Sequence, residues 1–570
     1  MFYLKLAWSN VKRNRLTYVP YLLAIALMSG MYQLIVGMIK SETLGSVPSG
    51  DSAKQMFQAG IIIFSFFAVF FMFYINNFLV NRRKREFGLY GVLGLDKGHI
   101  SRVLLWENAI VMAGGLLLGT IIAWVFGYLL FLLLLNMLNF VGDSSFSIGI
   151  DAYIVSYGLF GIIFVVISIW NSIRVHALNP MSLLQSEKKG DKPSKLMIPA
   201  AILGVVLLLG AYYHAWTTAK AGTAIAIFLA LVVLVIVATF LVFSSGSTLL
   251  LTLLRKNKRY YYKPKNFVTV SGMFHRMRQN ARGLSFICIL STMLIVTVAG
   301  TLALYLGRES IYRENHPFDV FTYVFSSDDT DEQGLNQAYA DAICELAENS
   351  GVTLVADVSK FSTDTALEGS DIFVNDLSEV MVVNERIIYA HNEFMFDVIG
   401  SQEDCLAFVD KLYEIDKAQI GADWGMFVSD IFNEREMGLG AYGGLLFLGV
   451  FFGVLFLAMT VLIIYFKQVT EGYEDKQRFI ILQQVGMDKK MVKGTINRQV
   501  QWMFFLPLFA TLLHMVFASK IMSTMLVLFQ ISDWLMVLAC IGGVCVVFIL
   551  LYLLVFRLTA KAYYKIVALK

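Results

Sequence analysis

Long apolar runs separated by short basic segments dominate the pattern along this chain. A helix needs about 20 apolar residues to cross the roughly 30 Å hydrocarbon core of a bilayer. Ten runs reach that length, at approximately 17–39, 57–80, 104–138, 148–173, 196–214, 222–254, 284–306, 439–466, 500–527 and 533–556. The third and sixth are long enough to tilt or to extend beyond the bilayer. The pattern therefore predicts a polytopic α-helical membrane protein with ten transmembrane helices.

The distribution of lysine and arginine predicts how these helices cross the membrane. If the N-terminus is cytoplasmic, the six inner segments hold 35 of the 46 basic residues, and only four basic residues lie near the short outer loops. Cytoplasmic loops are enriched in Lys and Arg. We therefore expect a multi-pass protein of the plasma membrane with both termini in the cytoplasm.

One polar segment differs in charge from the rest of the chain. Of all residues, 57% are hydrophobic and 15% are charged, and the formal net charge is +4. Residues 307–440 nevertheless hold 28 acidic and 7 basic side chains, a net of −21, so the remainder carries +25. We expect 307–438 to be a small α/β extracytoplasmic domain. Its predicted strands are Phe318–Phe325, Val352–Val358, Asp371–Val374 and Val380–Val383, and its predicted helices are Glu332–Asn349 and Gln402–Tyr413.

Two inner loops resemble each other. Residues 84–97 read KREFGLYGVLGLDK, and residues 476–489 read KQRFIILQQVGMDK, which match at an offset of 392. Each loop lies between one span that ends inside and another that starts inside. A duplicated four-span unit explains this, with spans 1–4 and 7–10 separated by an extra pair (4+2+4) and the acidic domain inserted between spans 7 and 8. The predicted divisions are 1–174 for the first unit, 175–264 for spans 5–6, 265–306 for an amphipathic segment and span 7, 307–438 for the acidic domain, and 439–570 for spans 8–10.

Both loops are predicted to contain a short amphipathic helix. Apolar residues recur at helical spacing before Gly94 in the first loop and before Gly486 in the second. A glycine there can end a helix in the left-handed conformation. Such a helix could lie on lipid or dock onto a partner, and its duplication favours docking.

Ionisable residues are scarce inside the predicted spans. Ion-coupled carriers need intramembrane carboxylates or histidines, so this scarcity argues against secondary transport. We interpret Glu107 as a first-turn carboxylate in the headgroup region rather than as a proton relay. His514 is interpreted as a packed or lumen-facing residue rather than as a ligand.

Signatures of catalysis, nucleotide binding and metal binding are absent from the sequence. No GxxxxGK[ST] phosphate loop, HExxH motif or CxxC pair occurs. We therefore expect no enzyme activity, no metal site and no cofactor bound by this chain, so ATP would have to be used by a separate subunit. Cys344 and Cys405 could form a disulfide or be two unrelated thiols.

The two loops, Arg83–Gly94 and Glu471–Gly486, resemble the inner loops of FtsX-like ABC transporter permeases. The 4+2+4 arrangement with one external domain is similar to that of the bacitracin-resistance (Bce-type) branch of Gram-positive bacteria. The resemblance implies the permease subunit of a transporter for peptide-antibiotic resistance or sensing. Such a subunit couples a dimeric ATPase to motions that remove antibiotic from lipid-linked cell-wall precursors, and many members also associate with a sensor histidine kinase.

The resemblance also implies which residues couple the two subunits. They are Phe87, Leu93, Gly94 and Asp96 in the first loop and Phe479, Val485, Gly486 and Asp488 in the second. The apolar side chains would fill grooves of the ATPase, the glycines would turn the chain, and the aspartates would cap the next helix. FtsX-type force transmission to cell-wall hydrolases and export of lipids or lipoproteins stay open as alternative functions.

The densest basic run is Arg255–Lys265, in which three tyrosines stand among the cations. Aromatic and basic residues together suit the surface of a membrane that contains anionic lipid. We expect anionic membrane lipid as a partner here, and no nucleic acid.

Overall fold

The computed structural model describes residues 2–47, 49–138, 140, 145–177, 197–262, 264–326, 332–355, 373–375, 380–383, 386–415, 425–484 and 489–567. It forms two compact units. The first comprises Met1–Tyr305, Gly443–Leu528 and Ser532–Lys570, and the second comprises Leu306–Tyr442 and Phe529–Ile531.

The ten predicted membrane-spanning helices are confirmed. Ten helical segments of the described chain are long and apolar enough to cross a membrane, namely Thr17–Ile39, Gly50–Asn81, Lys97–Met137, Ile150–Ala177, Met197–Thr217, Ala221–Lys256, Ala281–Arg313, Ile431–Val469, Val500–Phe529 and Trp534–Lys561. Hydrophobic runs locate such spans reliably because a helix satisfies all of its own backbone hydrogen bonds in lipid.

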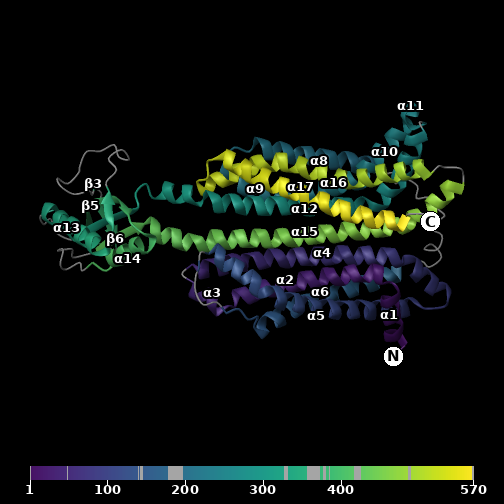
Figure 1. The fold of residues 1–570 in the computed structure, drawn as a ribbon, viewed down its shortest axis with the longest axis horizontal. Helices are drawn as coiled ribbons and strands as arrows, with labels where there is room; N and C mark the ends of the chain where they lie inside the picture. Colours follow the sequence, from purple (N-terminus) through teal and green to yellow (C-terminus); the bar gives the residue numbers. More distant parts are fainter. Residues whose placement is uncertain are drawn as a thin grey trace. The chain divides into compact units, whose positions relative to one another are not determined.

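Six helices form the first bundle (Figure 1). They are α1 (Phe2–Arg13), α2 (Arg15–Ile39), α3 (Glu42–Ser46), α4 (Gly50–Val92), α5 (Lys97–Met137) and α6 (Ile150–Ala177). Helices α2 and α5 approach backbone to backbone, because a Cβ atom on Gly30 would lie only 2.7 Å from the carbonyl oxygen of Gly119. Two facing glycines thus allow these two helices to pack closely.

The second bundle contains further helices and helical turns. They are α8 (Met197–Thr217), α9 (Ala221–Leu241), a π-helical turn (Val242–Gly246), α10 (Ser247–Lys256), α11 (Lys258–Tyr261), α12 (Pro264–Asn315), α15 (Ile431–Gln484), α16 (Lys489–Leu526), a 3-10 turn (Val527–Phe529) and α17 (Trp534–Val567). Helix α17 is joined to α16 by a hydrogen bond of 2.9 Å from the Tyr552 hydroxyl to the Phe504 carbonyl oxygen.

The separate amphipathic helices predicted for the inner loops are not found. The first loop's helical part is the last stretch of α4, which continues without a break from the span to Val92, and α15 likewise continues to Gln484. No proline interrupts either stretch, and the arginine, lysine and glutamate residues there are good helix formers. A helix that continues the span cannot lie flat on the lipid surface.

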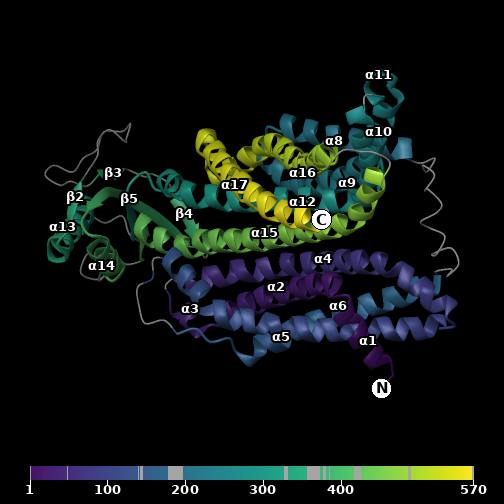
Figure 2. The same cartoon turned by 45° about the vertical axis from the view of Figure 1, so that its right-hand side comes forward.

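The two bundles pack against each other through α4 and α15, which lie side by side in both views (Figure 1, Figure 2). Three aromatic pairs line this contact, with ring centroids 5.7 Å apart for Phe57 and Phe447, 5.8 Å for Phe64 and Phe452, and 4.9 Å for Phe67 and Phe456. The partners are separated by 388 to 390 positions, close to the repeat offset of 392. Corresponding helices of the two four-span units therefore face each other in parallel and nearly in register.

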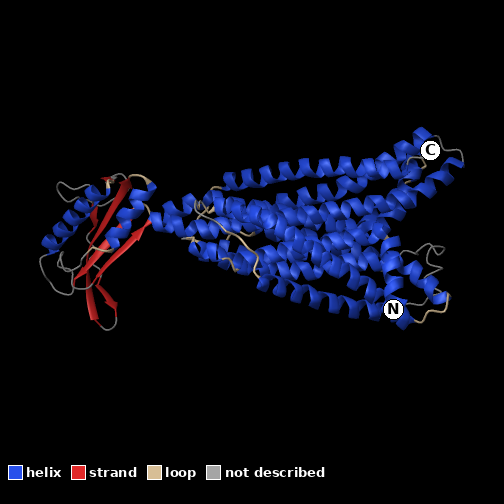
Figure 3. Ribbon diagram, turned by 60° about the horizontal axis from the view of Figure 1, so that its bottom comes forward, coloured by secondary structure: helices blue, strands red, loops and turns tan. Residues whose placement is uncertain are grey.

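The second unit contains all the strands in the described part of the chain (Figure 3). They are β1 (Val320–Ser326), β2 (Thr353–Val355), β3 (Phe373–Asn375), β4 (Val380–Val383), β5 (Arg386–Ile399) and β6 (Gly425–Asp430). The sheet order is β2-β5-β1-β6, with β3 and β4 also paired to β5, and every pairing is antiparallel.

Two helices, α13 (Glu332–Ser350) and α14 (Gln402–Tyr413), complete the fold of the second unit. They share a hydrophobic core with the sheet, which includes Tyr339, Phe394 and Phe408. An antiparallel sheet with two helices is an α+β arrangement rather than the predicted α/β one. No disulfide joins Cys344 to Cys405, both of which lie in described segments.

Candidate functional site at the end of the α4–α5 hairpin

The chain reverses direction sharply between α4 and α5. Helix α4 ends at Val92, and Gly94 has φ = +91°, as predicted for a glycine that ends the helix. The Leu95 N–H donates to the Tyr90 carbonyl at 3.0 Å, and the Gly94 N–H donates to the Gly91 carbonyl at 3.3 Å. This is the Schellman arrangement, in which a left-handed residue satisfies the last carbonyls of the helix. The turn therefore depends on Gly94.

Asp96 occupies the N-cap position of α5, with an extended backbone, but its side chain makes no capping hydrogen bond. Its backbone carbonyl accepts from the N–H groups of His99 and Ile100. The expected capping by the carboxylate is thus not observed, and the Asp96 side chain is exposed.

One face of the last turns of α4 is apolar and exposed. Leu89, Val92 and Leu93 are 51%, 58% and 70% exposed, and they share one face because they are spaced at i, i+3 and i+4. They lie beyond Asn81, where the apolar span ends. Leu93 is among the residues predicted for this site, whereas Leu89 and Val92 are not, because the predicted apolar face follows the spacing of Phe87 and Leu93.

Phe87 lies on the opposite face of the same helix. It is only 3% exposed, and the Arg83 guanidinium lies 5.2 Å from the centre of its ring. Phe87 therefore packs inside the first bundle, contrary to the expectation that it would fill a groove of a partner.

The second loop is only partly described. Phe479 lies on α15, and its side chain is outside the described residues, as are Val485, Gly486 and Asp488 altogether. The predicted roles of these four residues stay predictions.

A polar cluster with a buried centre, called here the Arg83 cluster, supports the hairpin from inside. Its members are Arg83, Glu107, Tyr18, Asn10, Glu86 and Asn14. Arg83 is 2% exposed and Glu107 is 0% exposed, and the Nη1 atom of Arg83 forms an ion pair with Glu107 Oε2 and donates to the Tyr18 hydroxyl. The other Glu107 oxygen, Oε1, accepts from Asn10 Nδ2 at 2.7 Å.

The environment of Glu107 differs from the one expected. Glu107 was interpreted as a headgroup-region carboxylate, but it is the eleventh residue of α5, and its side chain is fully enclosed. Its partner was missed as well, because Arg83 stands in a basic run that reads as a solvated face. Burial by itself would lower the pKa of the Arg83 guanidinium, but its interactions with Tyr18 and Glu107 raise that pKa above the ordinary value.

The second bundle contains a histidine in a buried network. His514 on α16 contacts Tyr212 of α8 through Nδ1 at 2.6 Å and Thr239 of α9 through Nε2 at 3.0 Å. The interpretation of His514 as a packed residue is confirmed by its 6% exposure. Its role is to join the extra pair of spans to α16.

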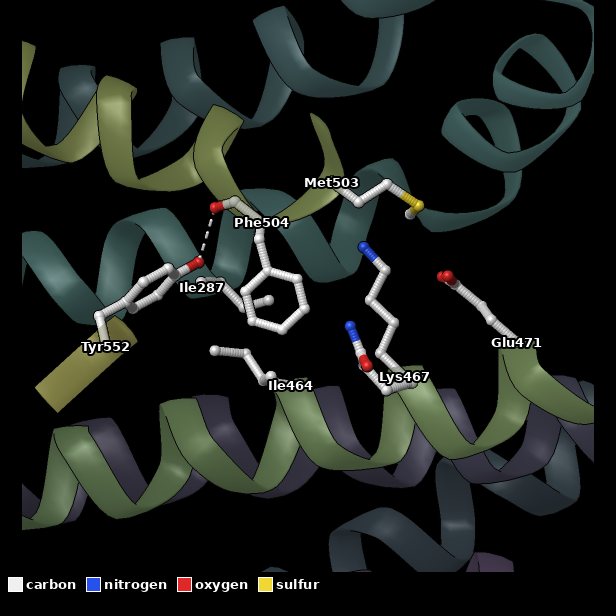
Figure 4. Close-up of a pocket in the computed structure, with 8 residues that line it drawn as sticks. Ile287, Ile464, Lys467, Glu471, Met503, Phe504 and Tyr552 are labelled. Atoms are coloured by element: carbon white, nitrogen blue, oxygen red, sulfur yellow. Dashed lines mark hydrogen bonds between the residues drawn. The ribbon is translucent and has the colours of Figure 1, made fainter. Parts of the chain in front are cut away.

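A small pocket lies between the helices of the second bundle (Figure 4). It is lined by Ile287, Ile464, Lys467, Gln468, Glu471, Met503, Phe504 and Tyr552. Its cavity volume is about 20 Å³, which is enough for about one or two waters and far below the size of a ligand pocket. Among the described residues, no group of three or more His, Cys, Asp or Glu side chains could hold a metal ion.

Residues 59–180 match the family model described as "FtsX-like permease C-terminal". This segment contains most of α4, all of α5 and α6, and therefore the hairpin turn. The chain carries an FtsX-like permease domain. The Arg83–Glu107 pair lies inside that domain.

Three relatives align with this chain over about nine-tenths of its length. "Uncharacterized ABC transporter permease YvcS" of Bacillus subtilis is 21% identical over 91% of this chain and 93% of its own length. "Bacitracin export permease protein BceB" of Halalkalibacterium halodurans is 23% identical over 90% of this chain and 92% of its own length. "ABC transporter permease protein YxdM" of B. subtilis is 22% identical over 91% of this chain and 93% of its own length. Over most of its length the chain is thus similar to ABC transporter permeases, and it is a multi-pass membrane protein.

Proposed function

We propose that this chain is the membrane subunit on which a separate, dimeric ATPase docks at the end of the α4–α5 hairpin. The observation that carries the proposal is the exposed apolar face of Leu89, Val92 and Leu93. These side chains lie beyond the span, so water would surround them without a partner, and exposed apolar patches of this kind mark interaction sites. The chain contains no phosphate-binding loop, so ATP hydrolysis belongs to the partner.

The proposed orientation places the hairpin turn and both termini in the cytoplasm. Its support is the excess of Lys and Arg in the segments on that side. The acidic second unit is then outside the cell, consistent with the plasma membrane of a Gram-positive bacterium.

The proposed activity is protection against peptide antibiotics that bind lipid-linked cell-wall precursors. A relative named as a bacitracin export permease supports this substrate class. The net charge of −21 over residues 307–440 adds long-range attraction for cationic peptides. A sensor histidine kinase would be a further partner, to which transport activity is reported.

The docking site is tested with Leu93→Glu, which places a charge in the exposed apolar face. The chain is co-purified with the ATPase encoded next to it, and the expected result is at least a tenfold loss of association and of stimulated ATP hydrolysis. Ile399→Glu is the matched control, because Ile399 is a similarly exposed apolar residue of the second unit. Full association of the Leu93→Glu variant would contradict the proposal.

The physiological role is tested by deletion of the gene. Hypersensitivity to bacitracin or to related peptides supports the proposed activity. Cell chaining without hypersensitivity would instead favour force transmission to cell-wall hydrolases, and a defect in lipoprotein localisation would favour export of lipids or lipoproteins.

A further inference from the structure

We propose that the Arg83 cluster is a positioning device, which passes a displacement of the hairpin turn to the N-terminal helix α1 and to span α2. The proposal rests on the proposed function, since it assumes that a partner moves the turn. It concerns residues within the bundle that touch no ATPase, and it assigns them a role in coupling rather than in docking.

The cluster joins four helices at one level of the bundle. Arg83 stands ten residues before Leu93 on α4, and Glu107 stands eleven residues after Asp96 on α5. At 1.5 Å per residue, both lie about 15 Å along their helices from the turn. The ion pair therefore closes the hairpin, while Asn10 from α1 and Tyr18 from α2 bind the same carboxylate at 2.7 Å and 2.8 Å.

A second layer of contacts extends this connection along α1. The Glu86 carboxylate accepts a 2.8 Å hydrogen bond from Arg83 Nε. It also accepts a 3.1 Å hydrogen bond from Asn14 Nδ2, and Asn14 lies at the bend between α1 and α2. The Tyr90 hydroxyl donates a 3.3 Å hydrogen bond to the side-chain oxygen of Asn10, Oδ1. Near the start of α1, the Tyr3 ring stacks on His99 of α5 at 5.8 Å. Helix α1 is thus held by the hairpin from its first turn to its last.

Burial makes the contacts of Arg83 and Glu107 difficult to break one at a time. Among the described residues Arg83 Nη2 has no hydrogen-bond partner, whereas Arg83 Nη1 and Nε and both Glu107 oxygens are paired. Since an unpaired charge or polar group is costly in a low-dielectric interior, these paired atoms keep their partners when the surroundings move. If the hairpin shifted while α1 and α2 did not, Glu107 would lose Asn10 and Tyr18, and Arg83 would lose Tyr18. A joint movement of the hairpin, α1 and the start of α2 avoids this cost in free energy.

The other face of α1 shows where that movement would be felt. Phe2 and Trp8 are large, exposed apolar residues on α1, and Lys12 and Arg13 end the helix. An apolar face bordered by basic residues suits the interface of a membrane. A shift of α1 would therefore move a segment embedded in the headgroup region.

A plain contribution to stability is the competing explanation, and a double substitution separates the two. Replacing a buried ion pair by apolar residues of similar size often preserves stability, whereas removing one partner does not. In Arg83→Met/Glu107→Met the bundle stays packed but the charged link between the helices is lost. Asn76→Leu/Asn171→Leu is the matched control, since it removes another buried pair of α4, whose amide groups bond reciprocally to α6 at 2.8 Å and 2.9 Å.

The experiment uses the full chain with its ATPase in lipid nanodiscs. Spin labels at Trp8→Cys on α1 and Ile150→Cys at the start of α6 report the distance between these helices with and without ATP. We expect an ATP-dependent distance change in the parent and in the Asn76→Leu/Asn171→Leu control. In Arg83→Met/Glu107→Met we expect that change to disappear and antibiotic protection to fall at least tenfold, with the melting temperature and ATPase association kept.

Wild-type distance change and protection in Arg83→Met/Glu107→Met would overturn the proposal, as would an equal loss in the control. If the double variant does not fold, Tyr18→Phe decides, because it removes one hydroxyl and keeps the ring. Reduced coupling at the parental melting temperature supports the proposal, and parental coupling overturns it. Leu93→Glu distinguishes the docking proposal from the positioning role. If Leu93→Glu loses the ATPase while Arg83→Met/Glu107→Met couples normally, docking at the hairpin stands and only the positioning role fails.

Discussion

The first bundle holds its α4–α5 hairpin with the buried pair Arg83 and Glu107. At the repeat offset of 392, the corresponding positions of the second bundle hold Asp475 and Gln499, which cannot form that pair. The loop motif itself, with its phenylalanine and glycine, is present in both. The two copies thus share the sequence motif of the loop but not the charged residues of the Arg83–Glu107 pair.

Each bundle is secured by a different additional element. In the first, α1 contributes Asn10 to the carboxylate of Glu107. In the second, the extra helices α8 and α9 contribute Tyr212 and Thr239 to His514 of α16. The difference predicts that the two bundles fail for different reasons when single residues are changed.

The largest expected effect comes from Glu107→Ala. It leaves the Arg83 guanidinium buried without its carboxylate, and breaking a buried pair in this way costs about 3–5 kcal/mol. We expect a fall in the melting temperature of the purified protein large enough to impair its yield. Gln499→Ala, at the corresponding position of the second bundle, is expected to shift that temperature by far less. Equal losses in the two variants would show that the bundles are not supported differently.

The sequence predicted the spans and the turn for simple physical reasons. Twenty apolar residues in a row suffice to identify a span, and Gly94 suffices for a left-handed turn. The Arg83–Glu107 pair could not be recognised from composition, because Arg83 lies among other arginines and its burial depends on how α1 and α2 pack. One signal was present in the sequence. Arg83 lies ten residues before Leu93 and Glu107 lies eleven residues after Asp96, so a helical hairpin that turns between Leu93 and Asp96 places the two side chains at the same height.

The second unit shows a different limit of the sequence pattern. Strands β5 and β6 were both missed, although β5 is the strand with the most neighbours in the sheet. The register between β1 and β5 shifts between Tyr323 and Val324. A bulge of this kind interrupts the alternation of buried and exposed positions, so β5 does not show the period of two that identifies a strand.

A second, smaller effect compares Asn76 with Gln468, which occupy the same position of the repeat. Asn76→Leu leaves the Asn171 amide group buried without its reciprocal partner, and the cost is about 1–3 kcal/mol. In the second bundle the Oε1 atom of Gln468 is buried and has no hydrogen-bond partner among the described residues. Gln468→Leu is therefore expected to change the melting temperature little.

The double variant Asn76→Leu/Asn171→Leu is the control for this comparison. It removes both amide groups, so most of the stability lost in Asn76→Leu should return. Thermal unfolding followed by tryptophan fluorescence measures all three variants. A loss in Gln468→Leu as large as that in Asn76→Leu would indicate that Gln468 also belongs to a satisfied network, and that the two bundles are more alike than their charged residues suggest.

The smallest effect tests what the two bundles share. Gly94 adopts φ = +91°, and a Cβ atom there would meet no other atom within 4 Å, so Gly94→Ala is penalised by its backbone conformation alone, by about 1–2 kcal/mol. Gly94→Asn should lose less, because asparagine tolerates the left-handed region. If the second loop turns in the same way, Gly486→Ala and Gly486→Asn will repeat this order in thermal unfolding. If Gly486→Ala unfolds at the parental temperature, the two loops share their sequence motif but not the left-handed turn. In that case only the first hairpin presents a docking surface held by such a turn.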